Sequence, residues 1–471
     1  MSEPKPNKSG LPFKFFATNR KTRSSKSVNS KTYERLEPRN LRASMAPTDA
    51  ATDSGIVESE CQVEVSEVVQ AASQDNQSSG RTFYIDPAIG NDANLGTADQ
   101  PFASYLPIVY SYDQADPNIG RVILQAGDEV VFRAGIYDET FQNPSDINTG
   151  TFRGLYLRGL SGTEENPIVF RAEPGAIINP NPADNSEWFS AEIIQSQHIE
   201  FSGFEFTGLG TGLHVATSSG IEISDNYFYD IDGDEDDNLS GINLTANSGL
   251  VVVQRNLFRD IYDRRDTQSA NNRALVAFGN DGADVYVINN TVLNTETDDG
   301  NLIAGGIVTK HGSNSTFTVS GNVLEGIGVQ AIGSNNPNTE ISENLIIRSD
   351  GISIRDFGGR SYFNDILIEN NTLVDSNFGL LYNPEDTYYP FGPYSGIGAL
   401  TFQSNLVQDV GRNTAESGTI SIGQYTTQEI ANAIEQPGNL ELIDNVFDDA
   451  IGDFQASLFI CLLYTSDAAD A

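Results

Sequence analysis

The six residues VINNTV at positions 287–292 decide the fold of this 471-residue chain, because seven similar segments flank them. Each segment places one Asn between short runs of alternating apolar residues, and successive Asn residues lie 22 to 40 positions apart. A repeat of this length is typical of a solenoid, whose units stack because none of them can bury its own apolar face. The repeated residues are Asn226, Asn256, Asn290, Asn322, Asn344, Asn371, Asn405 and Asn445.

We expect each coil of the solenoid to turn at its Asn, because Asn tolerates the left-handed backbone region better than other residues with a side chain. Stacked coils would place successive Asn side chains about 4.8 Å apart, so that each amide N–H donates to the next amide oxygen. Such a ladder satisfies polar groups whose burial is otherwise unfavourable. The shortest spacing of 22 residues fits one coil of three strands, and the longer spacings predict loops between strands.

A second pattern lies upstream of the Asn residues and consists of a small residue followed by an apolar, a variable and an apolar residue. Alternation with a period of two predicts strands whose apolar side chains point inward. The distance from the small residue to the next Asn is 14 to 16 residues in the first five cases and grows to 20 and 26 afterwards, so two strands per coil stay in phase. The pattern begins at Gly212, Gly241, Ala274, Gly306, Gly328, Gly351 and Gly379.

With its opening segments, such as Phe83-Tyr84-Ile85-Asp86 and Ala134-Gly135-Ile136-Tyr137, this repeat resembles the right-handed parallel β-helix, or pectin-lyase-like, family. The resemblance covers residues 81–456. It implies an all-β chain that forms a right-handed parallel β-helix solenoid with a short N-terminal cap, and we expect a helix of that cap at residues 104–113. The scaffold hosts several chemistries as well as many proteins that are not enzymes.

Charge divides the chain sharply. Residues 1–42 hold eleven Lys and Arg against three acidic residues, whereas the remainder holds 16 against 62. The acidic solenoid argues against nucleic acid and anionic membranes as partners, and we expect no membrane insertion. The basic start is rich in Ser and Asn and lacks apolar periodicity, which predicts a disordered tail.

Within that tail, Leu36-Glu37-Pro38-Arg39 resembles the LEPR-type signature of large surface proteins from planctomycete-like bacteria, although Arg42 replaces its usual second Leu. The resemblance implies export or sorting to the cell surface, and a merely basic tail is the alternative. We therefore divide the chain into a basic sorting segment (1–44), a polar linker (45–80), the β-helix (81–456) and a tail (457–471).

The tail departs from both repeat patterns around Cys461 and resembles translated sequencing-adapter sequence, so we expect the natural protein to continue differently from about residue 458. A short apolar cap is the alternative. Cys61 and Cys461 are too few and too far apart for a disulfide framework. The oligomeric state stays open.

The candidate catalytic residues are Lys310, Arg355 and His214. Lys310 is the only lysine after residue 31, and it follows an inward Thr309, so alternation points its side chain outward. In the second pattern Arg355 occupies the same column two coils later, about 10 Å away, and His214 lies on the same face. In lyases of the resembled family, a Lys or Arg removes the proton next to a uronate carboxylate, which a bound Ca²⁺ neutralises. The resemblance thus implies Lys310 as base and Arg355 as charge stabiliser, and two solvated surface residues are the alternative.

The same pattern shows two departures from the lyases. It places Ile332 one coil after Lys310, where the family carries an Arg. It also places Phe278 and Val276 one coil before Lys310, where paired acidic ligands are expected. Both departures favour a function without catalysis.

Two further segments are candidate binding sites. Alternating oxygen ligands between positions 230 and 238 predict a Ca²⁺ site or, alternatively, a solvated turn, and the ligands would be Asp230, Asp232, Asp234 and Asp236. Residues 383–396 are rich in aromatic side chains, which either stack on sugar rings or pack back on their coil. These side chains are Tyr388, Tyr389, Phe391 and Tyr394.

Two functions of different classes fit these features. In the first, the chain is an exported or cell-surface β-helix protein that binds a polysaccharide or cell-surface glycan, as one adhesive module of a longer surface protein. In the second, it is a Ca²⁺-dependent lyase of uronate-containing polymers such as alginate, pectate or chondroitin. The surface-sorting segment and the departures around Lys310 favour the first.

Overall fold

The structure is a computed structural model, and every residue that it describes belongs to the second of two compact units, Met1–Ser73 and Gln74–Ala471. All regular structure in the described part is β-strand. No helix in that part is long and apolar enough to cross a membrane. The described residues are 80–110, 119–142, 152–180, 188–232, 239–262, 273–294, 305–312, 314–328, 330–355, 365–377, 379–383, 400–408, 420–422 and 440–448.

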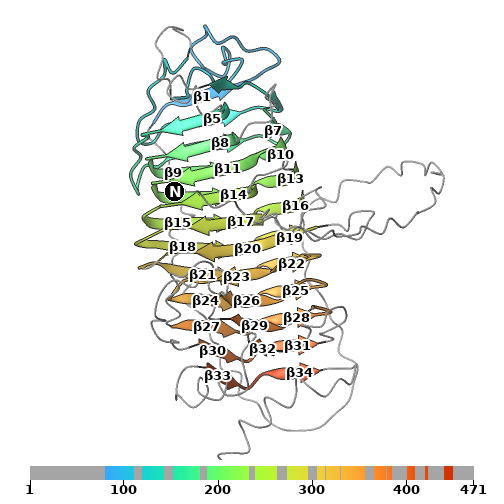
Figure 1. Cartoon of the computed structure of the whole chain (residues 1–471). Helices are drawn as coiled ribbons and strands as arrows, with labels where there is room; N and C mark the ends of the chain where they lie inside the picture. Colours follow the sequence, from blue (N-terminus) through green and yellow to red (C-terminus); the bar gives the residue numbers. More distant parts are fainter. Residues whose placement is uncertain are drawn as a thin grey trace, which may run out of the picture. The chain divides into compact units, whose positions relative to one another are not determined.

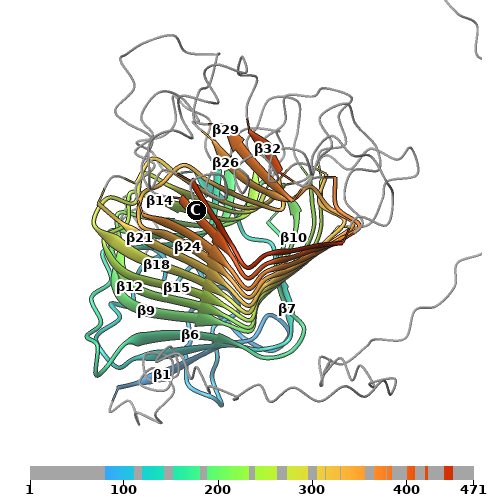
Figure 2. The ribbon, with the colours of Figure 1, turned by 90° about the horizontal axis from the view of Figure 1, so that it is seen from below.

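Three long sheets wrap around one core, and the chain passes through sheets I, II and III in turn (Figures 1 and 2). Sheet I contains β1 (Thr82–Ile85), β2 (Glu129–Phe132), β6 (Ile168–Ala172), β9 (Gln197–Ser202), β12 (Ser219–Ser224), β15 (Gly249–Gln254), β18 (Ala283–Ile288), β21 (Thr316–Ser320), β24 (Thr339–Ser342), β27 (Ile366–Glu369), β30 (Leu400–Gln403) and β33 (Leu440–Ile443). Sheet II contains β3 (Gly135–Tyr137), β7 (Ala176–Ile178), β10 (Glu205–Leu209), β13 (Tyr227–Asp232), β16 (Leu257–Tyr262), β19 (Thr291–Leu293), β22 (Val323–Glu325), β25 (Leu345–Ile347), β28 (Thr372–Val374), β31 (Leu406–Gln408) and β34 (Val446–Asp448). Sheet III contains β4 (Phe141–Gln142), β5 (Phe152–Arg158), β8 (Trp188–Ile194), β11 (Thr211–Ala216), β14 (Ser240–Thr245), β17 (Arg273–Phe278), β20 (Gly305–Lys310), β23 (Ile332–Ser334), β26 (Ile352–Arg355), β29 (Leu380–Asn383) and β32 (Ile420–Ile422).

Neighbouring strands in these sheets run parallel, except for the short antiparallel pair β4–β5. Three parallel sheets with this order confirm the predicted parallel β-helix. Seen along the axis of the coils, sheets I and II meet at a sharp corner (Figure 2). From the β9–β10 connection to the β33–β34 connection, that corner always consists of two residues, the second of which in all but the first case is the repeated Asn.

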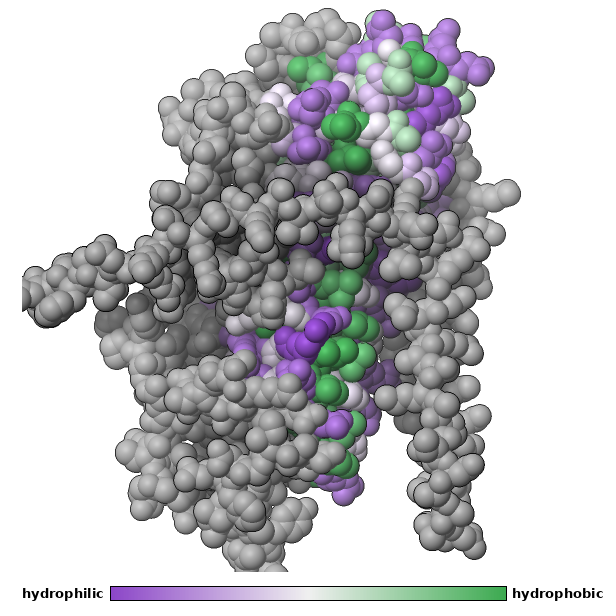
Figure 3. All heavy atoms as spheres, turned by 90° about the vertical axis from the view of Figure 1, so that its right-hand side faces the viewer, coloured by the Kyte–Doolittle hydropathy of each residue, from purple (hydrophilic) through white to green (hydrophobic). Residues whose placement is uncertain are grey.

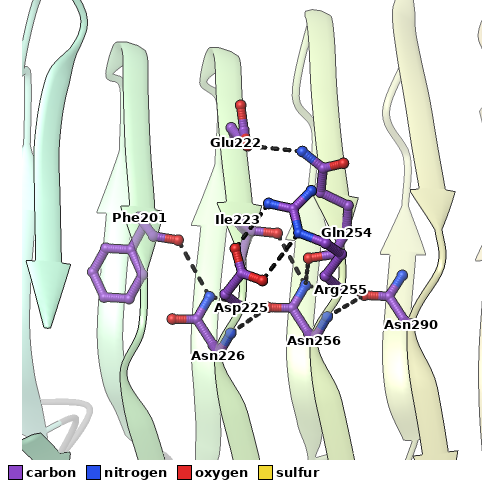
Figure 4. A network of polar contacts seen from close by, with 9 residues as sticks. All are labelled: Phe201, Glu222, Ile223, Asp225, Asn226, Gln254, Arg255, Asn256 and Asn290. Carbon is purple, nitrogen blue, oxygen red and sulfur yellow. Dashed lines mark hydrogen bonds and ion pairs between the residues drawn. The ribbon is translucent and has the colours of Figure 1, made fainter. Parts of the chain in front are cut away.

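The Asn ladder has the predicted bonding (Figure 4). Each amide Nδ2 donates to the Oδ1 of the Asn in the next coil over 2.9–3.1 Å, from Asn226 through to Asn445. The same oxygen also accepts from the backbone N–H of the preceding Asn over 2.8–3.0 Å. Each amide therefore satisfies the corner of its own coil and of its neighbour.

The left-handed residue of this corner is not the Asn, which corrects the sequence-based expectation. The residue before each Asn has the positive φ, for example 58° at Asp225, 55° at Arg255 and 55° at Asn289. The Asn itself has an ordinary backbone, because its amide must point along the stack to meet its neighbours. A left-handed residue with a side chain costs about 1–2 kcal/mol, which the amide bonds at the same corner offset.

A second polar stack, which the sequence analysis missed, lies at the corner between sheets III and I. The backbone N–H of Ser196 donates to Ser218 Oγ, that of Ser218 to Asn247 Oδ1, and that of Asn247 to Asn280 Oδ1, over 2.9–3.1 Å. The preceding residues again have positive φ. Because Ser occupies the first two of these positions and Asn the next two, the stack leaves no uniform repeat in the sequence.

Close packing, rather than backbone strain, explains the Gly residues of the second pattern. Phe206, Phe228 and Phe258 stack inside sheet II with ring centroids 4.8 and 5.0 Å apart. A Cβ on Gly212 would lie 2.8 Å from the Phe228 ring, and one on Gly241 would lie 2.7 Å from the Phe258 ring. The small Gly in each of these strands of sheet III therefore faces the large Phe of the sheet II strand that follows it in the chain.

The N-terminal cap contains no helix in its described part, so the helix predicted at residues 104–113 is wrong as far as residue 110. Turns in this segment bury Phe102, Tyr105 and Ile108 against the first coil. The chain enters sheet I beside a salt bridge of 2.5 Å between Arg81 and Asp128. The cap thus closes the apolar end of the solenoid with side chains and turns.

Candidate functional site

Sheet III differs from the other two sheets in the length of the connections that precede and follow its strands. From β9 onward the corner between sheets I and II is two residues long, whereas the connections into or out of sheet III run up to seventeen residues outside the described part, at 423–439. Other connections of this kind include residues 263–272, 295–304 and 356–364. The coil can therefore vary its length only beside sheet III, and the candidate catalytic residues all belong to this sheet.

The outer face of sheet III carries Lys310 at the end of β20. Its register partner in the preceding strand is Phe278. Phe278 is 45% exposed, which is unusual for a Phe, and its ring meets the His311 ring edge-on at a centroid distance of 5.0 Å. An exposed aromatic ring, a lysine and a histidine thus lie together on this face. Strand alternation in the sequence points Phe278 outward, but it does not show how far the ring is exposed or that His311 lies beside it.

Arg355 lies in the Lys310 column, as predicted. β23 pairs with β20 through Thr309 and Ser334, and β26 pairs with β23 through Ser334 and Ile354, so Arg355 follows two strands after Lys310. Only the backbone position of Arg355 is described. Two strand spacings correspond to about 10 Å.

The predicted position of Ile332 is wrong. Ile332 pairs with Ile307 and points into the core, with 1% of its surface exposed. The strand begins three residues after the position that Gly328 suggested, because Ala331 and not Gly328 aligns with Gly306. The residue that follows Ser334, and so occupies the column between Lys310 and Arg355, is Asn335. Its Oδ1 accepts from the backbone N–H of His311 over 2.9 Å.

His214 belongs to a separate group on the same sheet. β11, β14, β17 and β20 are successive strands, so His214 lies three spacings, or about 14 Å, from the Lys310 row. Its Nδ1 lies 3.0 Å from Oε1 of Glu192, whose side chain is only 2% exposed, and its ring stacks on Phe189 at 4.4 Å. The structure therefore does not bring His214 together with Lys310.

The predicted calcium ligands are only partly described. Asp230 is exposed and has a left-handed backbone, with φ of 48°, at the end of β13. Asp232 is described as a strand residue without its side chain, and Asp234 and Asp236 lie outside the described residues. Among the described residues there is no group of three His, Cys, Asp or Glu side chains that could hold a metal ion. The described residues therefore do not form a metal site.

The proposed sugar-stacking residues Tyr388, Tyr389, Phe391 and Tyr394 also lie outside the described residues. The surface-sorting segment at residues 36–39 lies outside them as well. Both interpretations therefore stay predictions from the sequence.

No protein-family model and no curated protein matches the sequence. Among solved structures, a GH136 lacto-N-biosidase from Eubacterium ramulus is similar with 15% identity and a TM-score of 0.47, over 79% of this chain and 68% of that one. The pectate lyase Pel9A is similar with 15% identity and a TM-score of 0.38, over 82% and 84%. An alginate lyase from Paenibacillus sp. str. FPU-7 is similar with 14% identity and a TM-score of 0.34, over 69% and 89%. These identities are too low to assign an activity, and the fold rests on the three sheets.

Proposed function

We propose that this chain is an exported carbohydrate-binding protein, and that it holds a polysaccharide or cell-surface glycan against the outer face of sheet III. The observation that carries the proposal is the exposed ring of Phe278 in register with Lys310. An exposed aromatic face stacks well on the apolar face of a sugar ring.

The charges around Phe278 favour a glycan that carries carboxylate or sulfate groups. Lys310 is the only lysine of the solenoid, and Arg355 follows in the same column. Elsewhere the solenoid is strongly acidic and repels such a polymer. An acidic glycan would therefore be held where these two cations lie, and high salt would weaken its binding.

Binding of the full chain to immobilised alginate, polygalacturonate and chondroitin sulfate tests this proposal. Phe278→Ala should weaken binding about fivefold, since an aromatic contact is worth about 1 kcal/mol. Lys310→Gln should weaken it further at low salt, whereas Lys310→Arg should retain it. Leu250→Ala is the matched control, because Leu250 is 42% exposed on sheet I. Binding by Phe278→Ala and Lys310→Gln at the wild-type level would refute the proposed site.

The second candidate is a polysaccharide lyase, favoured by the alignment of Lys310 and Arg355 in one column. In this case Lys310 in its neutral form would take the proton next to a uronate carboxylate, and Arg355 would stabilise the charge that develops. Incubation with the same polymers and Ca²⁺ should then produce the ultraviolet absorbance of an unsaturated product, which Lys310→Gln and chelation should abolish. Absence of that absorbance with all three polymers rejects the lyase and leaves the binding proposal standing.

A further inference from the structure

The outer face of sheet II carries a second group of aromatic and charged residues, away from the face considered above. Figure 3 looks onto this side of the coils and shows apolar side chains exposed along it. Strand alternation places Phe228 and Phe258 in the core, so that Tyr227 and Tyr229 of β13 and Arg259 of β16 point outward. Both tyrosines are part-exposed.

The two tyrosines form a preordered stack. Their ring centroids lie 4.5 Å apart with an angle of 26° between the planes, although the residues are only two positions apart on one strand. Tyr227 lies in register with Leu257 of the next strand, which extends the apolar surface by one coil. A β-bulge between Phe206 and Gly208 in the pairing of β10 with β13 accompanies this stack, and bulges commonly re-aim side chains near functional sites.

Polar groups surround the ring stack. Burial raises the pKa of the Tyr227 hydroxyl, and the nearby positive charge of Arg259 opposes that rise. The Arg259 Nε lies 3.2 Å from Asp260 Oδ2. The Arg259 side chain remains 52% exposed. On the other side of the stack, Glu205 lies close enough to Tyr229 to raise the pKa of its hydroxyl, after burial, which is the larger cause. Donors and acceptors are therefore held in place around an apolar platform, as recognition of sugar hydroxyls requires.

The charge of this group selects the kind of sugar. Among the described residues, the carboxylates Glu205, Asp230 and Asp260 lie near the tyrosines, together with the guanidinium of Arg259. An acidic sugar would be repelled here, whereas the hydroxyls of a neutral sugar can donate to the carboxylates and accept from the guanidinium. We propose that Tyr227, Tyr229 and Arg259 form a second carbohydrate site, which binds a neutral pyranose on the outer face of sheet II.

Calorimetric titration of the full chain with neutral β-linked gluco-, xylo- and galacto-oligosaccharides tests this site. We expect at least one series to bind, Tyr229→Ala to weaken that binding about tenfold, and Tyr229→Phe to retain it because the ring is kept. Tyr286→Ala is the matched control, since Tyr286 is a part-exposed tyrosine on the outer face of sheet I and should leave binding unchanged. Melting temperatures equal to the wild type show that each variant is folded.

The inference is overturned if none of the three neutral series binds, or if Tyr229→Ala binds them as the wild type does. It is equally overturned if Tyr286→Ala reduces binding as much as Tyr229→Ala. Its failure is separable from failure of the proposed function, because Phe278→Ala and Lys310→Gln should impair only the acidic polymers. Tyr229→Ala should impair only the neutral sugars.

Discussion

The N-terminal end and the repeat region of this solenoid are held together by different chemistry. In residues 80–142, charged groups secure the chain, with Asp128 accepting from Arg81 and Asp86 from Arg133. From Asn226 onward, neutral amides form a continuous ladder. Each amide of the ladder bonds to an identical amide in the adjacent coil. The first coil has no coil on its outer side and therefore cannot form this bond there. An end must therefore be closed by individual contacts, and charged contacts depend on pH where amides do not.

The largest effect is expected in the ladder. Asn290 is 1% exposed, and its amide donates to Val253 O and Asn322 Oδ1 while its oxygen accepts from Asn256. Asn290→Ala should lower the free energy of unfolding by about 3 kcal/mol, because it leaves several buried polar groups without partners. Urea unfolding followed by circular dichroism measures this loss, which should be the same at pH 5 and pH 8.

The neighbouring residue supplies the control. Asn289 has the left-handed backbone of the same corner and an exposed side chain. Asn289→Gly should change the free energy of unfolding by no more than about 0.5 kcal/mol, since Gly adopts this backbone readily. If both variants lose equal stability, the corner depends on backbone conformation rather than on the amide ladder.

A smaller and pH-dependent effect is expected at Asp128. Burial alone would raise the pKa of this carboxyl, but hydrogen bonds from the Arg81 guanidinium, the Arg81 N–H and the Gln125 N–H outweigh burial and lower it. A lowered pKa in the folded state means that the carboxylate stabilises the fold above its usual pKa of about 3.8 and that this contribution is lost as the pH falls further. Asp128→Asn should therefore cost about 2 kcal/mol at pH 7 and little at pH 2.

Hydrogen exchange locates this change. Amides of residues 80–142 should exchange faster in Asp128→Asn at pH 7, whereas those of residues 314–328 should not, because the units of a solenoid contact only their neighbours. Equal acceleration in both regions would show that the end and the ladder unfold as one unit, and would remove the contrast between them.

The smallest effect is expected at Glu139, with the opposite dependence on pH. Burial raises the pKa of its carboxyl from 4.5 to about 7. The folded state thus favours the protonated form, so stability falls as the pH rises from 4.5 to 7 and is constant above. Glu139→Gln should be more stable than the wild type by about 1 kcal/mol at pH 8. This value is smaller than the pKa shift alone implies, because solvent screens the partly exposed Glu139 side chain. Thermal unfolding at pH 4 and pH 8 measures the difference, and a variant that is less stable at pH 8 would contradict it.

The repeat made the fold predictable, but one irregular coil was enough to misplace Ile332. Spacing assigned the coils, and the Asn ladder followed because the side-chain amide of Asn can both donate and accept along a stack. Gly328 fits the second pattern, yet the strand begins at Ile332, since the hydrogen bonds from Gly306 and Ile307 go to Gln330 and Ala331. A sequence pattern does not show which of two small residues will pair.

The candidate site was predictable only in part. Counting along the pattern placed Arg355 two coils after Lys310, and the strand pairing agrees. The same counting could not show that Phe278 is exposed beside His311, or that His214 faces a buried Glu192. Exposure on the outer face of a sheet depends on the side chains packed beside each residue, and these differ from strand to strand.

By itself, the sequence determined the length of the coil, the inward side of each strand and the column of stacked amides, because these features repeat and each is local to a few residues. The tertiary structure alone decided that the residue before each Asn takes the left-handed backbone, and that Gly212 and Gly241 make room for Phe228 and Phe258. It also decided that Tyr227 and Tyr229 stack beside Arg259. These features depend on hydrogen bonds and packing with neighbouring strands, which a local sequence pattern does not set.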